Sequence, residues 1–297
     1  VINGILSKTK IFENIWIQPA SGDAGGALGS ALSAWHLHYK KDRLISSKKD
    51  SMKGSYLGPN FSDKDVELQL NKCGAVYEKL RDEDLINKVS EAIIKEKAVG
   101  WMQGRMEFGP RALGARSILA DPRSPRMQKQ LNFKVKYRES FRPFAPSVLR
   151  EDLQNWFDMN VDSPYMLLVG GISSDKKIEM TNEQKKLFGI NKLNIKRSEI
   201  PAVTHVDYSA RVQTVTKKTN KRYYDLISKF KEKTGCPILV NTSFNVRGEP
   251  IVNSPTDAFN CFMGTELDYL VIGNCILDKS NQDPKLKKNY TKEFELD

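Results

Sequence analysis

Three arginines stand close together in the stretch GRMEFGPRALGARSIL, residues 104–119. Arg105, Arg111 and Arg116 are six and five residues apart, with glycines between them. A guanidinium binds phosphate or carboxylate through two hydrogen bonds at once, and glycine lets the backbone come close to a bound group. The stretch therefore predicts a site for an anionic ligand.

Three further polar clusters follow along the chain. They are Lys136 with Arg142 in KVKYRESFRPFAP, then His205, Asp207 and Arg211, then NTSFNVRGEP at 241–250. Each lies where an apolar segment stops, and polar groups at strand ends usually line a cleft. We expect the four clusters to share one cleft, although any one of them alone is also typical of a solvated basic surface.

The residue types favour a polyphosphate held by charge and oriented by neutral donors. The arginine stretch is not a Walker A loop, because no GK[ST] follows its glycines. Ser243, His205 and Asp207 are the types of a nucleophilic triad, but no nucleophile elbow surrounds the serine. In an alternating strand, a histidine is more often a packed or edge residue.

Composition indicates a soluble globular protein with an anionic partner. Of the 297 residues, 39% are hydrophobic and 28% charged, and the net charge is +11. Residues 101–150 hold eleven Lys and Arg against three acids, so most of the excess lies there and favours a site. The four cysteines form no CxxC pair, which predicts reduced thiols in a cytoplasmic protein. No apolar run has the ~18 residues of a membrane span.

Helical and strand patterns alternate, which predicts an α/β or mixed α+β class. We expect helices at 63–74, 82–97, 124–137, 153–159, 220–235 and 254–265, and strands at 98–104, 141–149, 165–172, 202–215, 237–245 and 267–277. The first residues predict a strand at 14–19, a glycine turn at 21–30 and a helix at 31–40, with a domain boundary near residue 54. Residues 176–197 are a charged, exposed insertion.

Six motifs in order resemble the O-carbamoyltransferases of the NodU and antibiotic-tailoring type. They are SGDAGGALGSA, GRMEFGPRALGARSILADPR, NFKVKYRESFRPFAPSVL, SPYMLLV, THVDYSARVQTV and CPILVNTSFNVRGEPIV. The resemblance implies a C-terminal YrdC-like domain, a twisted mixed sheet with helices, after the end of an actin-like (ASKHA) ATPase domain. We expect a remnant of the actin-like domain at 1–54, the YrdC-like domain at 55–280 and a charged tail at 281–297.

The resemblance also implies a reaction in two steps. The YrdC-like domain makes carbamoyl-adenylate from carbamoyl phosphate and ATP, and the actin-like domain, with iron(II), transfers the carbamoyl group to the hydroxyl of a small-molecule or sugar acceptor. We predict Lys136, Arg142 and Arg111 as catalytic residues. Those predicted to bind substrate and nucleotide are Arg105, Arg116, Arg211, Asn241, Ser243 and Asn245, with the three arginines of the first stretch forming a wall around the phosphates.

The metal site departs from the family pattern. Asp23 matches its aspartate ligand, but the family also has two histidines at i and i+4 of a helix, whereas His36 and His38 are two residues apart. We therefore expect an incomplete iron site, in a partial chain or in one that pairs with a separate polypeptide.

Two alternatives to an enzyme stay open. One is a basic YrdC-like module that binds nucleic acid; against it, Phe141 and Phe144 adjoin prolines and are expected to be packed, unlike stacking platforms. The other is a remnant that binds ATP without turnover.

Overall fold

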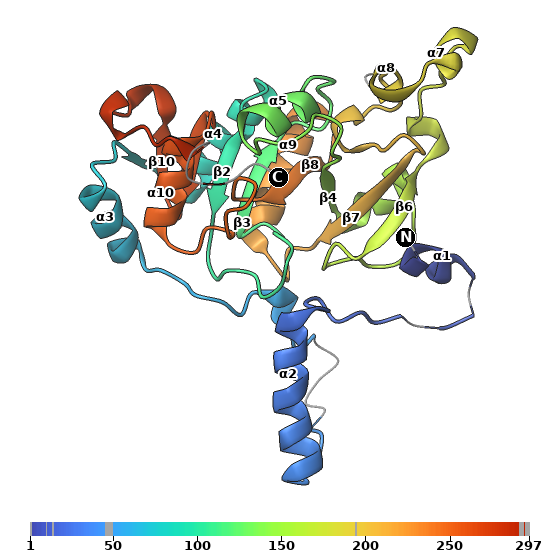
Figure 1. Ribbon diagram of the computed structural model, residues 1–297, viewed down its shortest axis with the longest axis horizontal. Helices are drawn as coiled ribbons and strands as arrows, with labels where there is room; N and C mark the ends of the chain where they lie inside the picture. The colour runs from blue at the N-terminus through green and yellow to red at the C-terminus, as the bar shows by residue number, and fades with distance from the viewer. Residues whose placement is uncertain are drawn as a thin grey trace.

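The computed structural model describes residues 2–9, 11–13, 15–44, 50–193, 195–290 and 294. Its centre is one mixed sheet of ten strands in the order β1-β10-β9-β2-β3-β8-β4-β7-β6-β5 (Figure 1). The strands are β1 (Glu78–Lys79), β2 (Val99–Met102), β3 (Arg116–Ala120), β4 (Ala145–Leu149), β5 (Phe157–Asp158), β6 (Leu168–Ile172), β7 (Ser209–Val215), β8 (Ile238–Ser243), β9 (Tyr269–Ile272) and β10 (Cys275–Asp278). The pairs β2/β9 and β4/β7 are parallel and the other pairs antiparallel. The mixed sheet with its helices confirms the predicted fold class.

The described α-helices are α1 (Ile2–Thr9), α2 (Asp23–Ser33), α3 (Asp63–Lys72), α4 (Asp82–Ile94), α5 (Met127–Lys134), α6 (Leu153–Trp156), α7 (Asn182–Lys186), α8 (Gly189–Leu193), α9 (Lys221–Thr234) and α10 (Pro255–Gly264). Helix α9 packs on β4, β8 and α4, while α10 packs on β2 and β9. None of these helices has both the length and the apolar character needed to cross a membrane.

The strongest sequence signals give the helices nearest the predicted site. Apolar residues at helical spacing bury one face of α9, and the helix ends at Gly235, which adopts φ +75°. Ser254 caps α10, as predicted, by accepting a hydrogen bond from the Asp257 backbone. Every residue of β2, β3 and β4 is buried, so the middle of the sheet is a rigid base.

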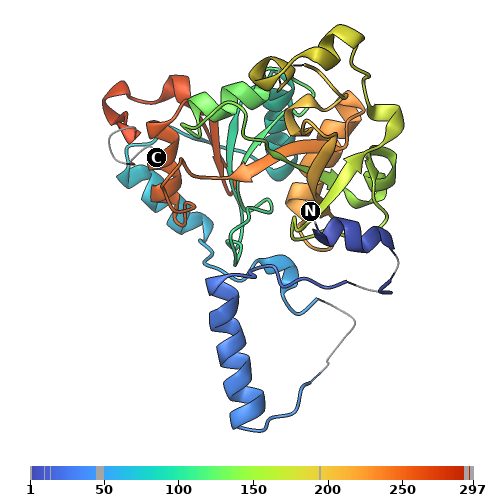
Figure 2. The same cartoon turned by 45° about the vertical axis from the view of Figure 1, so that its right-hand side comes forward.

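The first forty residues differ from the prediction. The described residues 15–19 form no strand, and the glycine segment expected as a turn is part of α2. Helix α2 continues into a π-helical turn at Ala34–His38 and projects from the body with no buried residue (Figures 1 and 2). Helix α1 packs against β6. Small residues and Asp23 in the first turn are compatible with a helix, and the glycines concealed this pattern.

Four strands, β1, β3, β5 and β10, were not predicted, and β5 lies within the helix predicted at 153–159. Strand β3 begins at Arg116 itself, and the segment 267–277 is a hairpin, β9 and β10, that turns at Gly273 with φ +55°. The start of the charged tail is packed, because Gln282 is buried and exchanges hydrogen bonds with the backbone of Val76.

Candidate functional site

The arginine loop, residues 104–115, connects the antiparallel strands β2 and β3. A hydrogen bond from the Gln103 backbone to the Ala115 carbonyl closes its base at 2.9 Å. Inside the loop, Oε1 of buried Glu107 accepts hydrogen bonds from the backbone of Leu113 at 2.6 Å and of Ala115 at 2.7 Å. Burial raises the pKa of Glu107, whereas these backbone donors favour its charged form. Glu107 was not predicted, although it is the one acid of the stretch.

Three strands hold the other side of the loop. Gln213 on β7 donates to the Leu113 carbonyl at 2.8 Å, and Asn241 on β8 donates to the Ala112 carbonyl at 3.1 Å. Ser147 on β4 joins them, because it donates to Gln213 Oε1 at 2.6 Å and accepts from Asn241 at 3.1 Å. Asn241 is 1% exposed and its Oδ1 has no hydrogen-bond partner among the described residues. These strands therefore fix the backbone that carries Arg111.

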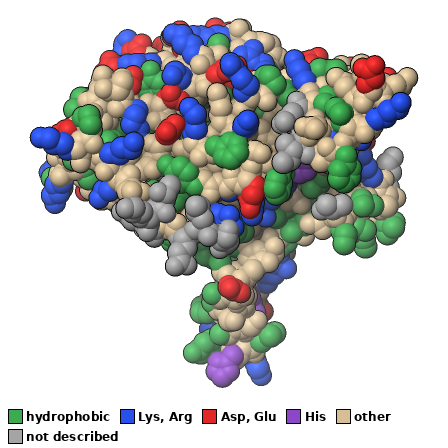
Figure 3. All heavy atoms as spheres, turned by 45° about the horizontal axis from the view of Figure 1, so that its top comes forward, with side chains coloured by type: hydrophobic (Ala, Val, Ile, Leu, Met, Phe, Trp, Pro, Cys, Tyr) green, Lys and Arg blue, Asp and Glu red, His purple; other side chains and the backbone are tan. Residues whose placement is uncertain are grey.

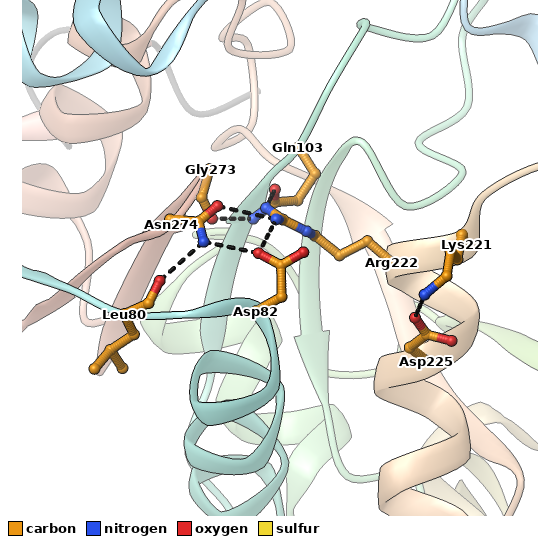
Figure 4. Close-up of polar contacts among 8 residues, drawn as sticks. All are labelled: Leu80, Asp82, Gln103, Lys221, Arg222, Asp225, Gly273 and Asn274. Atoms are coloured by element: carbon orange, nitrogen blue, oxygen red, sulfur yellow. Dashed lines mark hydrogen bonds and ion pairs between the residues drawn. The ribbon is translucent and has the colours of Figure 1, made fainter.

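A polar network anchors the loop where β2 and β9 end (Figure 4). The Arg222 guanidinium on α9 donates to Gln103 Oε1 at 2.8 Å, to Asp82 at 2.6 Å and to Asn274 at 2.9 Å. Gln103 in turn donates to the Gly273 carbonyl at 3.0 Å. The network joins the N-terminal ends of α4 and α9 to the base of the loop.

Arg116 supports the loop instead of lining a ligand site. Its side chain is fully buried, and it donates to the carbonyls of Ala115 at 3.0 Å, Gly104 at 3.2 Å and Asn253 at 3.3 Å. Burial lowers its pKa to about 10, and the charge of Glu107 opposes that shift. The expectation that all three arginines form the phosphate wall is therefore wrong for Arg116, because backbone carbonyls already occupy its donors.

Arg111 and Arg211 form the most unusual feature of the site. Both are half-buried, and the buried Nε of each has no hydrogen-bond partner among the described residues. Burial and the nearby charge of Arg111 lower the pKa of Arg211 to about 10, and burial also lowers the pKa of Arg111. No described carboxylate offsets either charge. Two like charges without a counter-ion are the arrangement that an anionic ligand would complete.

Lys136 and two residues of the NTSFN motif form a second cluster. The Lys136 ammonium is buried and donates to the Ser243 carbonyl, to Ser243 Oγ at 3.1 Å, and to the carbonyl and Oδ1 of Asn245, both at 2.9 Å. Burial, aided by the charge of Arg138, lowers the pKa of Lys136 to about 7. These contacts bring two of the four predicted clusters together, the Lys136 segment and the NTSFN motif.

Arg142 lies in a third cluster at the surface. Its Nε donates to Glu139 at 2.9 Å, and its side chain is 45% exposed. Arg138 packs over the Phe144 ring at 5.0 Å, and burial lowers its pKa to about 10. Phe144 is buried as predicted, but Phe141 is 52% exposed, so that expectation is wrong for Phe141.

Arg105 and the residues of the possible triad have other contacts. Exposed Arg105 donates to the Gly58 carbonyl at 2.9 Å. Ser243 Oγ donates to Asn245, and Asp207 accepts from Ser209. No hydrogen bond among the described residues joins Ser243, His205 and Asp207 as a triad. Two hollows of about 900 and 470 Å³ lie elsewhere, the first between α1 and β5, the second between α4 and α9.

Asp23 has no partner ligands for a metal. It is the exposed first residue of α2, and no group of three or more His, Cys, Asp or Glu among the described residues is arranged to hold a metal ion. His36 Nδ1 instead lies 2.7 Å from the Lys41 carbonyl. The described residues therefore do not fit an iron site.

Figure 3 shows Lys and Arg spread over one face of the body with Asp and Glu among them, and hydrophobic side chains along the projecting helix.

Comparison with known proteins agrees with these motifs. A family model described as the C-terminus of carbamoyltransferases matches residues 90–279, and one described as their N-terminus matches residues 1–32. The chain is 54% identical, over its whole length, to an uncharacterized protein of Synechocystis, of which it covers 49%. It is 40% identical to nodulation protein NolNO of Sinorhizobium fredii, over 96% of this chain and 39% of that protein. It is 38% identical to nodulation protein NolO of Bradyrhizobium diazoefficiens, over 94% of this chain and 47% of that protein. The chain thus spans about half the length of these relatives or less.

Proposed function

This chain belongs to the carbamoyltransferase family, and we propose that its arginine loop binds ATP and carbamoyl phosphate and forms carbamoyl-adenylate. The observation that carries the proposal is the pair Arg111 and Arg211, two partly buried guanidiniums without a described counter-ion. ATP and carbamoyl phosphate both carry phosphate groups, so either compound would place strong negative charge beside these two arginines. The acceptor of the carbamoyl group would be a hydroxyl of a small molecule or sugar.

The proposed reaction sets a task for fixed positive charge. Water would first release phosphate from carbamoyl phosphate and leave carbamate. A carbamate oxygen would then form a bond to the α-phosphorus of ATP as the bond between the α- and β-phosphates breaks, giving carbamoyl-adenylate and pyrophosphate. Charge then grows on the equatorial and leaving oxygens, and guanidiniums that are already in place stabilise it without reorganising. We assign this role to Arg111 and Arg211. The loop that carries Arg111 is held by Glu107, Gln213 and Asn241. Arg211 lies in β7, where it pairs with Val169 of β6.

Lys136 and Arg142 complete the proposed phosphate site. The Lys136 ammonium already lies against Ser243 and Asn245, so it would present its charge together with the Ser243 hydroxyl. Arg142 is exposed enough to turn toward a ligand. Asn241 would act through the loop, because its side chain holds the Ala112 carbonyl. All four cysteines are free thiols, which supports a cytoplasmic enzyme.

The transfer step cannot be derived from the described residues. It needs a Lewis acid or general base near the acceptor hydroxyl, and Asp23 alone does not provide the iron site that the resemblance implied. The reaction that we propose for this chain is therefore the formation of the adenylate.

Titration calorimetry of the chain with ATP plus carbamoyl phosphate tests the proposal, together with an assay for pyrophosphate release. We expect saturable binding and release, both lost in R111M and in R142A. R142K should also be poor, because an ammonium cannot make the bidentate contact. Well-folded protein that binds neither compound would refute the proposal. Binding of RNA with a steep salt dependence would favour a nucleic-acid module instead.

A further inference from the structure

One carboxylate spans two arginines in the surface cluster. Glu139 Oε2 accepts a hydrogen bond from Arg142 Nε at 2.9 Å, and Glu139 Oε1 lies 3.6 Å from Arg247 Nη1. The arginines come from separate motifs, and the Arg247 backbone donates to the Lys136 carbonyl at 3.3 Å. The Glu139 carboxylate therefore lies between two guanidiniums beside the proposed phosphate site.

A third arginine, Arg138, lies near the Glu139 carboxylate. Arg138 lies near the same groups, because its pKa responds to the charges of Arg142, Glu139 and Arg247. The Arg138 Nε donates to Asn132 at 2.7 Å and its guanidinium stacks on Phe144, so its position is fixed by other residues. Three guanidiniums therefore lie around the Glu139 carboxylate, and Arg142 and Arg247 are its two ion-pair partners.

Glu139 is held there loosely. Its side chain is 40% exposed and that of Arg142 is 45% exposed, whereas that of Arg247 is 16% exposed. Exposed ion pairs are weak, so the carboxylate can turn into water with little loss. A phosphate group, with more charge and more acceptor oxygens, makes stronger contacts with the same guanidiniums.

We propose that Glu139 is an internal competitor of the ligand: it occupies Arg142 and Arg247 in the free chain and is displaced by a phosphate group of the substrate. The inference rests on the proposed function, because it assumes that a phosphate compound binds at this cluster. While Glu139 is paired with the two arginines, weakly charged anions from solution would not bind them. Binding would then require a ligand with enough negative charge to displace the Glu139 carboxylate. Glu139 is therefore a residue that tunes affinity.

Calorimetry with carbamoyl phosphate on wild type and E139Q tests the competition. Removing the carboxylate charge while keeping the side-chain shape should tighten binding about two- to fivefold, the range of an exposed ion pair. E96Q is the matched control, because Glu96 pairs with Arg126 at 2.9 Å outside the cluster and is 34% exposed. Binding by E96Q should equal wild type. Unchanged or weaker binding by E139Q would overturn the proposal and show that the carboxylate orients Arg142 for the ligand.

A second readout separates this inference from the proposed function. The NMR signal of Arg142 Nε–Hε, assigned by its loss in R142K, reports the ion pair directly. Carbamoyl phosphate should shift this signal in wild type, and in E139Q the free protein should already lack the ion-pair shift. If the compound binds while the signal stays unchanged, the displacement is wrong and the proposed function stands. If wild type, E139Q and E96Q all fail to bind, the proposed function and this inference fail together.

Discussion

Replacing Arg211 with methionine should stabilise the fold while abolishing ligand binding. Methionine keeps the unbranched, flexible stem of arginine and removes the charge. The native guanidinium has no described counter-ion, and the charge of Arg111 lies nearby. A side chain kept for stability alone would not be expected to give this result.

The size of the gain follows from the cost of the buried charge. Burial and Arg111 lower the pKa of Arg211 to about 10, which corresponds to about 3 kcal/mol against the charged form. Water screens part of this cost because the side chain is only partly buried, so we expect R211M to gain about 1–2 kcal/mol in unfolding free energy. For a domain of this size that corresponds to roughly 2–8 °C in Tm.

Urea and thermal denaturation measure the gain, and R123M is the matched control. Arg123 donates to buried Asp121 through Nε at 2.9 Å and Nη2 at 2.6 Å, so its removal leaves a buried carboxylate unpaired and should cost about 2–4 kcal/mol. Calorimetry should show that R211M binds carbamoyl phosphate at least about thirtyfold more weakly than wild type. The reasoning is wrong if R211M unfolds as easily as R123M.

Three other changes test the supports of the site. Binding of a phosphate ligand should raise the lowered pKa of Lys136, because it favours the charged form. The chain should therefore take up a proton on binding, and its affinity should fall as pH rises above about 7. Calorimetry in two buffers of different ionisation enthalpy measures this proton uptake, and an uptake of zero would exclude the role of Lys136. In E107A the free energy of unfolding, measured with urea, should fall by about 3 kcal/mol, because three backbone donors lose their acceptor. It should fall less in E107Q, which keeps an acceptor oxygen. In R222A the free energy of unfolding, measured by thermal denaturation, should fall by about 1 kcal/mol. In K221A, which breaks only an exposed ion pair, it should stay within about 0.5 kcal/mol of wild type. Equal losses in the two variants would contradict the anchoring role of Arg222.

The sequence predicted best the elements that have their own start and stop signals. Helices α4, α9 and α10 combine apolar spacing with acids in the first turn, a terminal glycine or a capping serine. Strand β3 lacked such signals because it follows the arginine loop without a break and begins at Arg116. The glycines predicted a turn at 21–30, but most of this segment belongs to α2. Because α2 has no buried residue, no apolar face marked it as a helix, and the low helix propensity of glycine misled the prediction.

The site was predicted only in part, because residue type does not show what a side chain touches. Lys136, Ser243 and Asn245 meet as the motifs suggested. Ser147 and Gln213 were missed because their importance lies in contacts across three strands, which no local spacing records. Arg111 and Arg116 looked alike in the sequence, yet one has an unpartnered Nε and the other is fully engaged.

That difference gives a physical criterion for the ligand-binding arginines of this chain. Where an arginine stabilises the fold, the chain supplies an acceptor: Asp121 for Arg123, and backbone carbonyls for Arg116. Among the described residues, the buried Nε atoms of Arg111 and Arg211 receive none, although the buried Glu107 carboxylate shows that the loop has room for an acid. Two partly buried charges without a paired group lower the free energy of unfolding. A ligand anion would restore that stability, because it would bind the folded state and not the unfolded state. Phosphate should therefore protect wild type against urea and leave R211M unprotected, a difference that does not depend on turnover.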